Sequence, residues 1–315
     1  MFCFDGLLEE IEQADIITIF RHVHPDCDAV GSQFGLKNWL LENYPDKKVY
    51  ALGKEYCTQG NCWPASDVPG REELKESLAL VVDTADEERI DDDSFELARR
   101  LIKIDHHPNR SPYGQRMYVF ETSASTCEIL AEFFRQSGKE MSQKTAEYLY
   151  RGMLTDTLCF RTTNTQSHTL EIAGWTAQFS VRIPELNREL FDQSLRDFRF
   201  ANMIRSTVKI LDQKLAYRII TVKEQKEWGM TASEARNFVD EYGHVREFEI
   251  FLLITEREHN GSFVYDASLR SKTVVINGIA EKFRGGGHRN ASGVKGLTRT
   301  ECDELISALF ASIPR

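Results

Sequence analysis

The sequence predicts an α/β protein with two domains joined by a helical segment. Three observations support this fold class. Up to residue 185 short apolar runs alternate with helical patterns, residues 186–213 have helical periodicity without a strand pattern, and strand patterns return from residue 214. Strands that alternate with helices form a mainly parallel sheet flanked by helices, which we expect in domain 1–185. We expect 186–213 to be a helical linker, 214–315 to be a smaller α/β domain, and the active site to lie in the interdomain cleft.

The first domain is predicted from its apolar periodicity. Short apolar runs predict strands at 16–20, 49–52, 79–82 and 102–104. Patterns of helical period predict helices at 5–14, 29–41, 122–136 and 142–154. Ser125 followed by Glu128 has the spacing of a capping box, which supports a helix that begins there. This order of elements indicates successive βα units.

The second domain is predicted from a different pattern. Strands are expected at 215–222, 249–255 and 262–269, and helices at 274–283 and 299–311. Asn260-Gly261 is typical of a two-residue hairpin turn, so the last two strands should pair as a hairpin.

Composition narrows the function. The 315-residue chain is 41% hydrophobic and 28% charged, with no apolar run near the roughly 20 residues that span a bilayer. An acidic N-terminus argues against a signal peptide, so we expect a cytoplasmic protein without a membrane partner. The net charge of -10 argues against binding long duplex nucleic acid, although a small phosphorylated ligand is compatible with it. Seven scattered cysteines favour reduced thiols over disulfides or a thiolate metal site. The oligomeric state stays open, a homodimer being one option.

Metal-ligand residues follow three of the predicted strands. Carboxyl ends of parallel strands share one edge of a sheet, so these side chains should meet in one crevice. The residues are His22, Asp26, Asp28, Asp83, Asp105, His106 and His107. Carboxylates with imidazoles suit Mn²⁺, Mg²⁺ or Fe²⁺. The pattern therefore predicts a site for divalent metals.

Each of these motifs also has a plain structural interpretation. Asp26 and Asp28 are two residues apart and would point the same way in an extended stretch, but Asp-rich turns are common. Asp83 alone could be a helix cap. Two adjacent imidazoles are harder to explain structurally, because each ring nitrogen needs a partner, and Asp105 could orient one of them. Asp156 offers the last carboxylate for a two-metal site in which Asp83 bridges the metals.

The second domain carries two motifs suited to an anionic ligand. Successive glycines Gly285, Gly286 and Gly287 let backbone N–H groups converge on an anion, and His288 follows them. Arg270, in the segment Ala-Ser-Leu-Arg-Ser, can hold a phosphate with two hydrogen bonds. A glycine-rich turn without a ligand is the alternative. We favour substrate binding by Arg270 and this loop.

Five separated motifs together resemble a known family. The segments are HVHPDCDAVGS, VVDT, IDHHP, TDT and GGGH. In this order they resemble the Asp-His-His (DHH) phosphoesterase superfamily with its associated C-terminal domain, and most closely its soluble bacterial nano-RNases that are also 3'-phosphoadenosine-5'-phosphate (pAp) phosphatases. The resemblance implies two Mn²⁺ ions. One would be held by His22, Asp26 and Asp83, the other by Asp28, Asp83, His106 and Asp156. It further implies that His107 contacts the scissile phosphate, and that Arg270 with the loop 285–288 holds the other end of the nucleotide.

The implied activity is hydrolysis of phosphate esters. The expected reactions are removal of mononucleotides from short RNA, including dinucleotides such as pApA, and conversion of pAp to AMP. Alternatives are a cyclic di-AMP phosphodiesterase, an inorganic pyrophosphatase of the same superfamily, and a binding module without activity. The sequence does not rank pAp against nano-RNA, and it leaves the polarity of digestion open.

Overall fold

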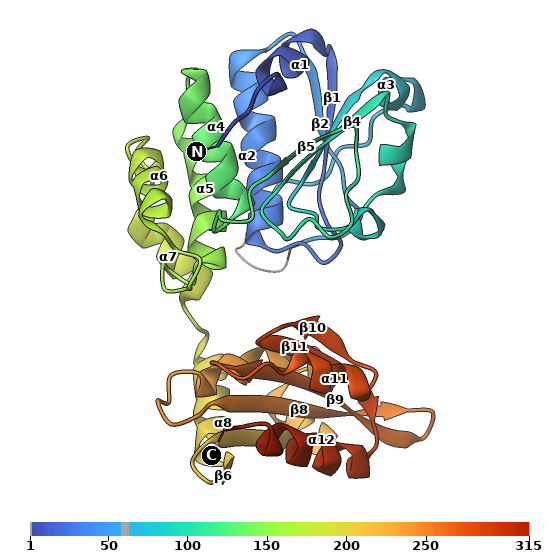
Figure 1. The fold of residues 1–315 in the computed structure, drawn as a ribbon, viewed down its shortest axis with the longest axis vertical. Coiled ribbons are helices and arrows are strands. Elements are labelled where there is room, and N and C mark those ends of the chain that lie inside the picture. Colours follow the sequence, from blue (N-terminus) through green and yellow to red (C-terminus); the bar gives the residue numbers. More distant parts are fainter. Residues whose placement is uncertain (1, 58–62, 315) are drawn as a thin grey trace. The chain divides into compact units, whose positions relative to one another are not determined.

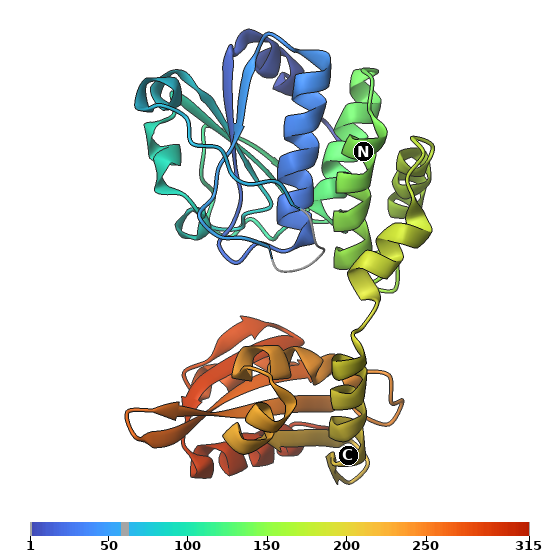
Figure 2. The same ribbon diagram turned by 180° about the vertical axis from the view of Figure 1, so that it is seen from behind.

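The computed structural model describes residues 2–57 and 63–314, and the chain divides into two compact units, Met1–Asp192 and Gln193–Arg315 (Figures 1 and 2). Each unit has its own sheet and its own apolar clusters. The segment expected to be helical contains α7 (Ile183–Phe191) in the first unit and α8 (Leu195–Ser206) in the second. The helices are separated by the irregular residues 192–194, where the boundary between the units falls.

The first unit contains a five-stranded sheet among its described residues, in the order β2-β1-β3-β4-β5. Every neighbouring pair is parallel, which confirms the expected mainly parallel sheet. The strands are β1 (Ile16–Phe20), β2 (Lys48–Ala51), β3 (Leu78–Val82), β4 (Arg100–Asp105) and β5 (Arg116–Val119). The chain reverses its winding between β1 and β3, and in such sheets a crevice opens at the carboxyl ends of the strands at that point.

Helices cover both faces of this sheet (Figure 1). One face packs against α1 (Leu7–Gln13), α2 (Cys27–Asn43), α4 (Thr126–Ser137) and α5 (Gln143–Asp156), and the other against α3 (Arg71–Glu76) and the 3-10 helices Glu87–Arg89 and Asp93–Leu97. Helix α6 (Ser167–Ala177) lies beyond α4 and α5. Alternation along β3 explains the two layers, because Leu80 and Val82 join the first apolar cluster while Ala79 and Val81 join the second.

Small residues let α2 and α5 approach closely. A Cβ atom added to Gly31 would lie 2.6 Å from the Tyr148 carbonyl oxygen. A Cβ atom added to Gly152 would lie 2.3 Å from Cys127 Sγ and 2.7 Å from Asp28 Oδ1. The three helices α2, α4 and α5 can therefore meet at this point only because no side chain separates them.

The second unit is the expected smaller α/β domain. Its sheet runs in the order β10-β11-β9-β8-β7-β6 and is mixed, because β7 pairs parallel with β8 while the other pairs are antiparallel. The strands are β6 (Lys209–Leu211), β7 (Leu215–Ile220), β8 (Ile250–His259), β9 (Ser262–Ser271), β10 (Gly286–His288) and β11 (Ala291–Leu297). Asn260 and Gly261 both have positive φ, 49° and 75°, as a hairpin turn of type I′ requires.

Helices also cover both faces of the second sheet. Apolar residues of α8, of α10 (Ala232–Arg236) and of the 3-10 helix Asn237–Tyr242 pack on one face, with α9 (Val222–Trp228) beside them. The other face is covered by α11 (Asn277–Lys282) and α12 (Arg299–Ala311). Within residues 2–57 and 63–314, none of the helices combines the length and the apolar character that crossing a membrane requires.

Candidate active site

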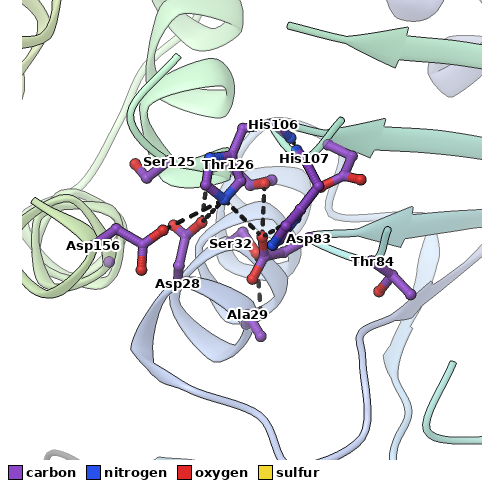
Figure 3. Close-up of polar contacts among 12 residues, drawn as sticks. Asp28, Ala29, Ser32, Asp83, Thr84, His106, His107, Ser125, Thr126 and Asp156 are labelled. Atoms are coloured by element: carbon purple, nitrogen blue, oxygen red, sulfur yellow. Dashed lines mark hydrogen bonds and ion pairs between the residues drawn. The ribbon is translucent and has the colours of Figure 1, made fainter. Parts of the chain in front are cut away.

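Polar side chains from three strand ends and two helices meet at one edge of the first sheet (Figure 3). Three groups of them each have ligand atoms within 4.8 Å of one another. The groups are His22, Asp26, Asp83; Asp28, His106, Asp156; and Asp83, His106, His107. The structure thus brings together all six residues that the sequence suggested as metal ligands.

His22 follows β1 and is almost fully buried. Its Nδ1 atom is 2.7 Å from the carbonyl oxygen of Val23. A carbonyl can only accept a hydrogen bond, so Nδ1 carries the proton. The Nε2 atom lies 3.4 Å from Asp83 Oδ2 and 3.8 Å from Asp26 Oδ2. The carbonyl therefore fixes the ring with Nε2 toward the two carboxylates, an arrangement common for histidine ligands of metals.

The expectation of an extended stretch through Asp26 and Asp28 is wrong. Asp26 is the N-cap of α2, and its Oδ1 accepts hydrogen bonds from the backbone of Asp28 and Ala29, both at 3.0 Å. Asp28 lies in the first helical turn and is fully buried. Its carboxylate accepts the backbone N–H groups of Thr126 at 2.7 Å and Cys127 at 2.9 Å. These N–H groups belong to the first turn of α4, whose positive end stabilises the charge.

Asp83 lies at the centre of the site. Its φ of 50° is in the left-handed region, which Asp tolerates better than most residues. Its side chain is buried, with Oδ2 3.4 Å from His22 Nε2 and Oδ1 3.5 Å from His106 Nε2. The Thr126 hydroxyl donates to the same Oδ1 atom at 3.1 Å. One carboxylate thus faces the imidazoles of two different strand ends.

Asp156 reaches the site from the last residue of α5, which extends two residues beyond the expected end of that helix. Its Oδ2 atom lies 3.4 Å from His106 Nε2. The same Nε2 is 3.8 Å from Asp28 Oδ2. His106 is therefore surrounded by three carboxylates, those of Asp28, Asp83 and Asp156 (Figure 3).

His107 has a different environment from His106. Its Nδ1 atom is 2.8 Å from Asp105 Oδ1 and 3.6 Å from Asp83 Oδ1. Asp105 Oδ1 also accepts the backbone N–H of His106 at 2.8 Å. Asp105 was expected to orient a histidine that binds metal, but the ring that it holds is His107. The His107 nitrogen that faces Asp83 therefore already has a closer partner in Asp105.

The site contains more buried carboxylates than its imidazoles can neutralise. Burial and the charge of Asp83 raise the pKa of Asp28 to about 7, and burial together with Asp28 raises that of Asp156 well above its usual range. Burial alone would lower the imidazole pKa values. The hydrogen bonds and the negative charge of Asp83 outweigh this effect of burial, and they raise the pKa of His22 to about 9 and that of His106 to about 10. Divalent cations would relieve this repulsion.

The donor set fits a hard or borderline metal ion. Carboxylate oxygens and imidazole nitrogens make up all three groups found among residues 2–57 and 63–314, and no thiolate takes part. Such donors are typical for Mn²⁺, Mg²⁺ and non-haem Fe²⁺. The site is suited to metal-assisted chemistry on a phosphate ester.

The glycine loop of the second unit lines a separate pocket of about 510 Å³. Gly285 and Gly286 border it together with three cationic residues, Arg236, Arg284 and Lys295. Arg270 is not among the described residues that line it. Its Nε atom is 3.3 Å from Asp240 Oδ1. His288 ends β10, but its side chain lies outside what the structure describes.

Sequence reasoning missed four contributors to these sites. Thr126 supports Asp83, Lys103 lies 3.3 Å from Asp105, Gly152 makes room for Asp28, and Arg236 lines the second pocket. Two of them had a usable signal. Thr126 begins a helix directly after its N-cap Ser125, and Lys103 interrupts an apolar strand two residues before Asp105.

The chain is similar to known proteins over most of its length. The model of the DHH family, N-terminal domain, matches residues 16–153, and the DHHA1 domain model matches 212–313. The bifunctional oligoribonuclease and PAP phosphatase NrnA of Bacillus subtilis is 33% identical over 306 residues, covering 96% of either chain. The probable NrnA of Streptococcus mutans is 32% identical, covering 98% of either chain. An exopolyphosphatase-related protein from Bacteroides fragilis has the same fold, with a TM-score of 0.86, 24% identity, and coverage of 98% of this chain and 95% of that one.

Proposed function

The chain belongs to the DHH family of divalent-metal-dependent phosphoesterases, and from this premise we propose that it hydrolyses short oligoribonucleotides and pAp. The products are mononucleotides from RNA, including dinucleotides such as pApA, and AMP from pAp. Support comes from two relatives that are named for both activities and match over nearly their whole length. Substrates of this kind occur inside cells, so a cytoplasmic location goes with the proposal.

One observation carries the proposal: two groups of potential metal ligands share the edge of one sheet, with Asp83 beside both. We assign His22, Asp26 and Asp83 to one divalent ion and Asp28, Asp83, His106 and Asp156 to a second. The family resemblance favours Mn²⁺ for both. Ions held there would lower the pKa of water and neutralise charge on the phosphate.

The protein itself supplies orientation and a proton path. Asp83 is held by Thr126 and by its left-handed backbone, so its carboxylate keeps its place between the imidazoles. Asp105 holds Nδ1 of His107, which leaves Nε2 free to face the scissile phosphate. We assign to His107 the contact with that phosphate through Nε2. When the ring carries a proton on both nitrogens, Nε2–H can donate its proton to the leaving oxygen while Nδ1–H stays bonded to Asp105.

We assign catalysis to residues 1–185 and substrate binding to residues 214–315, with 186–213 as the linker. Arg270, Gly285, Gly286, Gly287 and His288 are proposed to bind the nucleotide. For the glycine loop, support comes from the cationic pocket that Gly285 and Gly286 line, because its volume of about 510 Å³ suits a nucleotide. The Asp240 carboxylate that pairs with Arg270 is largely exposed, so a phosphate can replace it.

The alternative substrates, cyclic di-AMP and pyrophosphate, are less favoured, because the two relatives reported above match over nearly their full length and neither is named for acting on them. The test is a Mn²⁺-dependent digestion of 5'-labelled RNAs from two to twenty-four nucleotides, with pAp, cyclic di-AMP and pyrophosphate in parallel. We expect the shortest RNAs and pAp to be hydrolysed fastest. Faster turnover of pyrophosphate or cyclic di-AMP than of both would contradict the proposal.

The nucleotide-binding assignment is tested with Arg270→Ala. Losing a charge-assisted contact should raise KM for dinucleotides by roughly tenfold and leave the metal content unchanged. Arg299→Ala is the matched control, because it removes another exposed arginine, paired with Asp303, from the same unit. If both variants change KM equally, the assignment of Arg270 is wrong.

A further inference from the structure

A buried lysine lies beneath the Asp-His-His triplet. Lys103 is the fourth residue of β4, and its side chain has 0% exposure. A lysine is seldom fully buried unless its charge is paired, because removing an ammonium group from water is costly. Side chains alternate along a strand, so Lys103 lies on the same face as Asp105, while Ile102 and Ile104 join the apolar cluster on the other face.

The Lys103 ammonium joins the two loops that carry the reactive groups. Its Nζ atom is 2.7 Å from the carbonyl oxygen of Ala85, in the loop after Asp83. The same atom is 3.5 Å from Asn109 Oδ1, in the loop after His107. A single charge thus holds both loops.

An aromatic ring completes the surroundings of the ammonium. Lys103 Nζ lies 4.6 Å from the centre of the Tyr113 ring, a distance at which the ring face attracts a cation. The Tyr113 hydroxyl donates to the carbonyl oxygen of Thr84 at 2.6 Å, next to Asp83. The lysine therefore has attractive partners on several sides, which explains how the strand can hold its charge away from water.

The lysine is connected to His107 through Asp105. Lys103 Nζ lies 3.3 Å from Asp105 Oδ2, and Asp105 Oδ1 lies 2.8 Å from His107 Nδ1. The Asp105 carboxylate forms an ion pair with this ammonium, and a carboxylate can only accept hydrogen bonds. Nδ1 of His107 must then carry the proton, and the ring is held with Nε2 pointing away from Asp105.

We propose that Lys103 is a positioning residue for hydrolysis, which acts through Asp105 to hold the His107 ring in one orientation, with a proton kept on Nδ1 and with Nε2 turned away from Asp105. The inference rests on the proposed function, because it takes the role of His107 from there. It goes beyond that function, because it makes the orientation of the His107 ring depend on Lys103, which we place in contact with neither the proposed metal ligands nor the substrate. Lys103→Met keeps the length and removes the charge, so it separates this role from filling space.

The experiment is a double-mutant cycle on the full chain with Mn²⁺ and a dinucleotide substrate. Lys103→Met, Asp105→Asn and the double variant are compared for kcat, KM, metal content and melting temperature. We expect Lys103→Met to lower kcat by about 10- to 100-fold, as loss of a partner that orients a site residue typically does, with KM and metal content within about twofold. The double variant should be no slower than the slower single variant, because both changes act on one path.

A matched control separates positioning from general destabilisation. Thr18→Val removes a buried hydrogen bond of 3.0 Å to Ser77 within the same sheet, away from the site. It should lower the melting temperature and leave kcat unchanged. The proposal would be overturned if the fold-losses in kcat of the two single variants multiplied in the double variant. It would also be overturned if a folded Lys103→Met variant kept the kcat of the wild type.

A measurement on the wild type covers the case in which Lys103→Met fails to fold. Histidine ¹⁵N NMR of the Mg²⁺-loaded protein, assigned with His107→Gln, should show a protonated Nδ1 on His107. An unprotonated Nδ1 would refute the inference. If the wild type hydrolyses neither dinucleotides nor pAp while His107 shows the expected signal, the proposed function fails but the Lys103–Asp105–His107 arrangement stands.

Discussion

Asp83 is the residue on which the two-metal proposal depends most directly. Its carboxylate faces His22 at 3.4 Å and His106 at 3.5 Å, so each proposed ion loses a ligand if it is removed. Asp83→Asn is the suitable variant, because Asn also tolerates the left-handed backbone. Loss of a residue that only supports a metal ligand typically lowers activity by roughly 10- to 100-fold, and we expect Asp83→Asn to lower kcat by more than that. Metal content measured by mass spectrometry should fall with it.

Asp67→Asn is a suitable control for this change, because Asp67 pairs with Lys37 outside the three ligand groups. It should keep both metal content and kcat. Near-normal turnover in Asp83→Asn would rule out a bridging role for this carboxylate.

The raised histidine pKa values predict how metal binding depends on pH. In the metal-free protein Asp83 raises the pKa of His22 to about 9 and that of His106 to about 10, so both imidazoles hold their protons at neutral pH. A metal ion must displace these protons, so its affinity should increase as the pH rises toward 9 and weaken as the pH falls. Calorimetric titrations with Mn²⁺ in buffers of different ionisation enthalpy would measure the released protons. Affinity independent of pH between 6 and 9 would contradict this assignment of protons.

Among the secondary-structure elements, the contact of α5 with α2 and α4 decides the geometry of the site. In Gly152→Ala the added Cβ would overlap Cys127 Sγ and Asp28 Oδ1, so α5 must shift and carry Asp156 with it. We expect a loss of stability of about 1–3 kcal/mol, as in other overpacked cores, together with weaker metal binding. Urea denaturation and metal titration would test both.

Gly174→Ala provides a matched control on α6, because a Cβ there meets nothing within 4 Å. Alanine favours a helix by about 1 kcal/mol over glycine, so this variant should be more stable and equally active. Equal behaviour of the two variants would show that close packing at Gly152 is unimportant.

For the whole molecule, the two units have separate cores and should unfold separately. The proposed metal ligands all belong to Met1–Asp192. Saturating Mn²⁺ should therefore raise the temperature of only one calorimetric transition. Each bound ion should stabilise that unit by about 2.7 kcal/mol at a hundred times its dissociation constant. In Asp83→Asn this shift should disappear. A metal-dependent shift of both transitions would show that the units unfold together.

Seven of the strands in the described residues and the long helices α2, α4, α5 and α12 were predictable, because their buried faces impose a strong periodicity. The strands β6, β10 and β11 of the second unit were not predicted. The predicted ends of the apolar strands β1, β3 and β4 lie within one or two residues of the observed ends, and the hairpin turn is at Asn260-Gly261 as predicted. The strand β5 (Arg116–Val119) was missed, because a short, half-buried strand at a sheet edge lacks such a pattern. The 3-10 helices on the second face of the sheet were missed for the same reason.

The linear order of residues determined the fold class, through the alternation of strand and helix patterns, and the family resemblance, through five separated motifs. It also identified six candidate metal ligands, because most of them follow strands whose ends share one edge of a parallel sheet. Only the tertiary structure decided how these ligands are arranged. It placed Asp26 as the N-cap of α2, directed the Asp28 carboxylate to the backbone N–H groups of the first turn of α4, and placed Asp105 between His107 and the buried Lys103. These relations join residues of different strands and helices. Sequence patterns report which face of an element a residue occupies, whereas the partner across that face depends on how the elements pack.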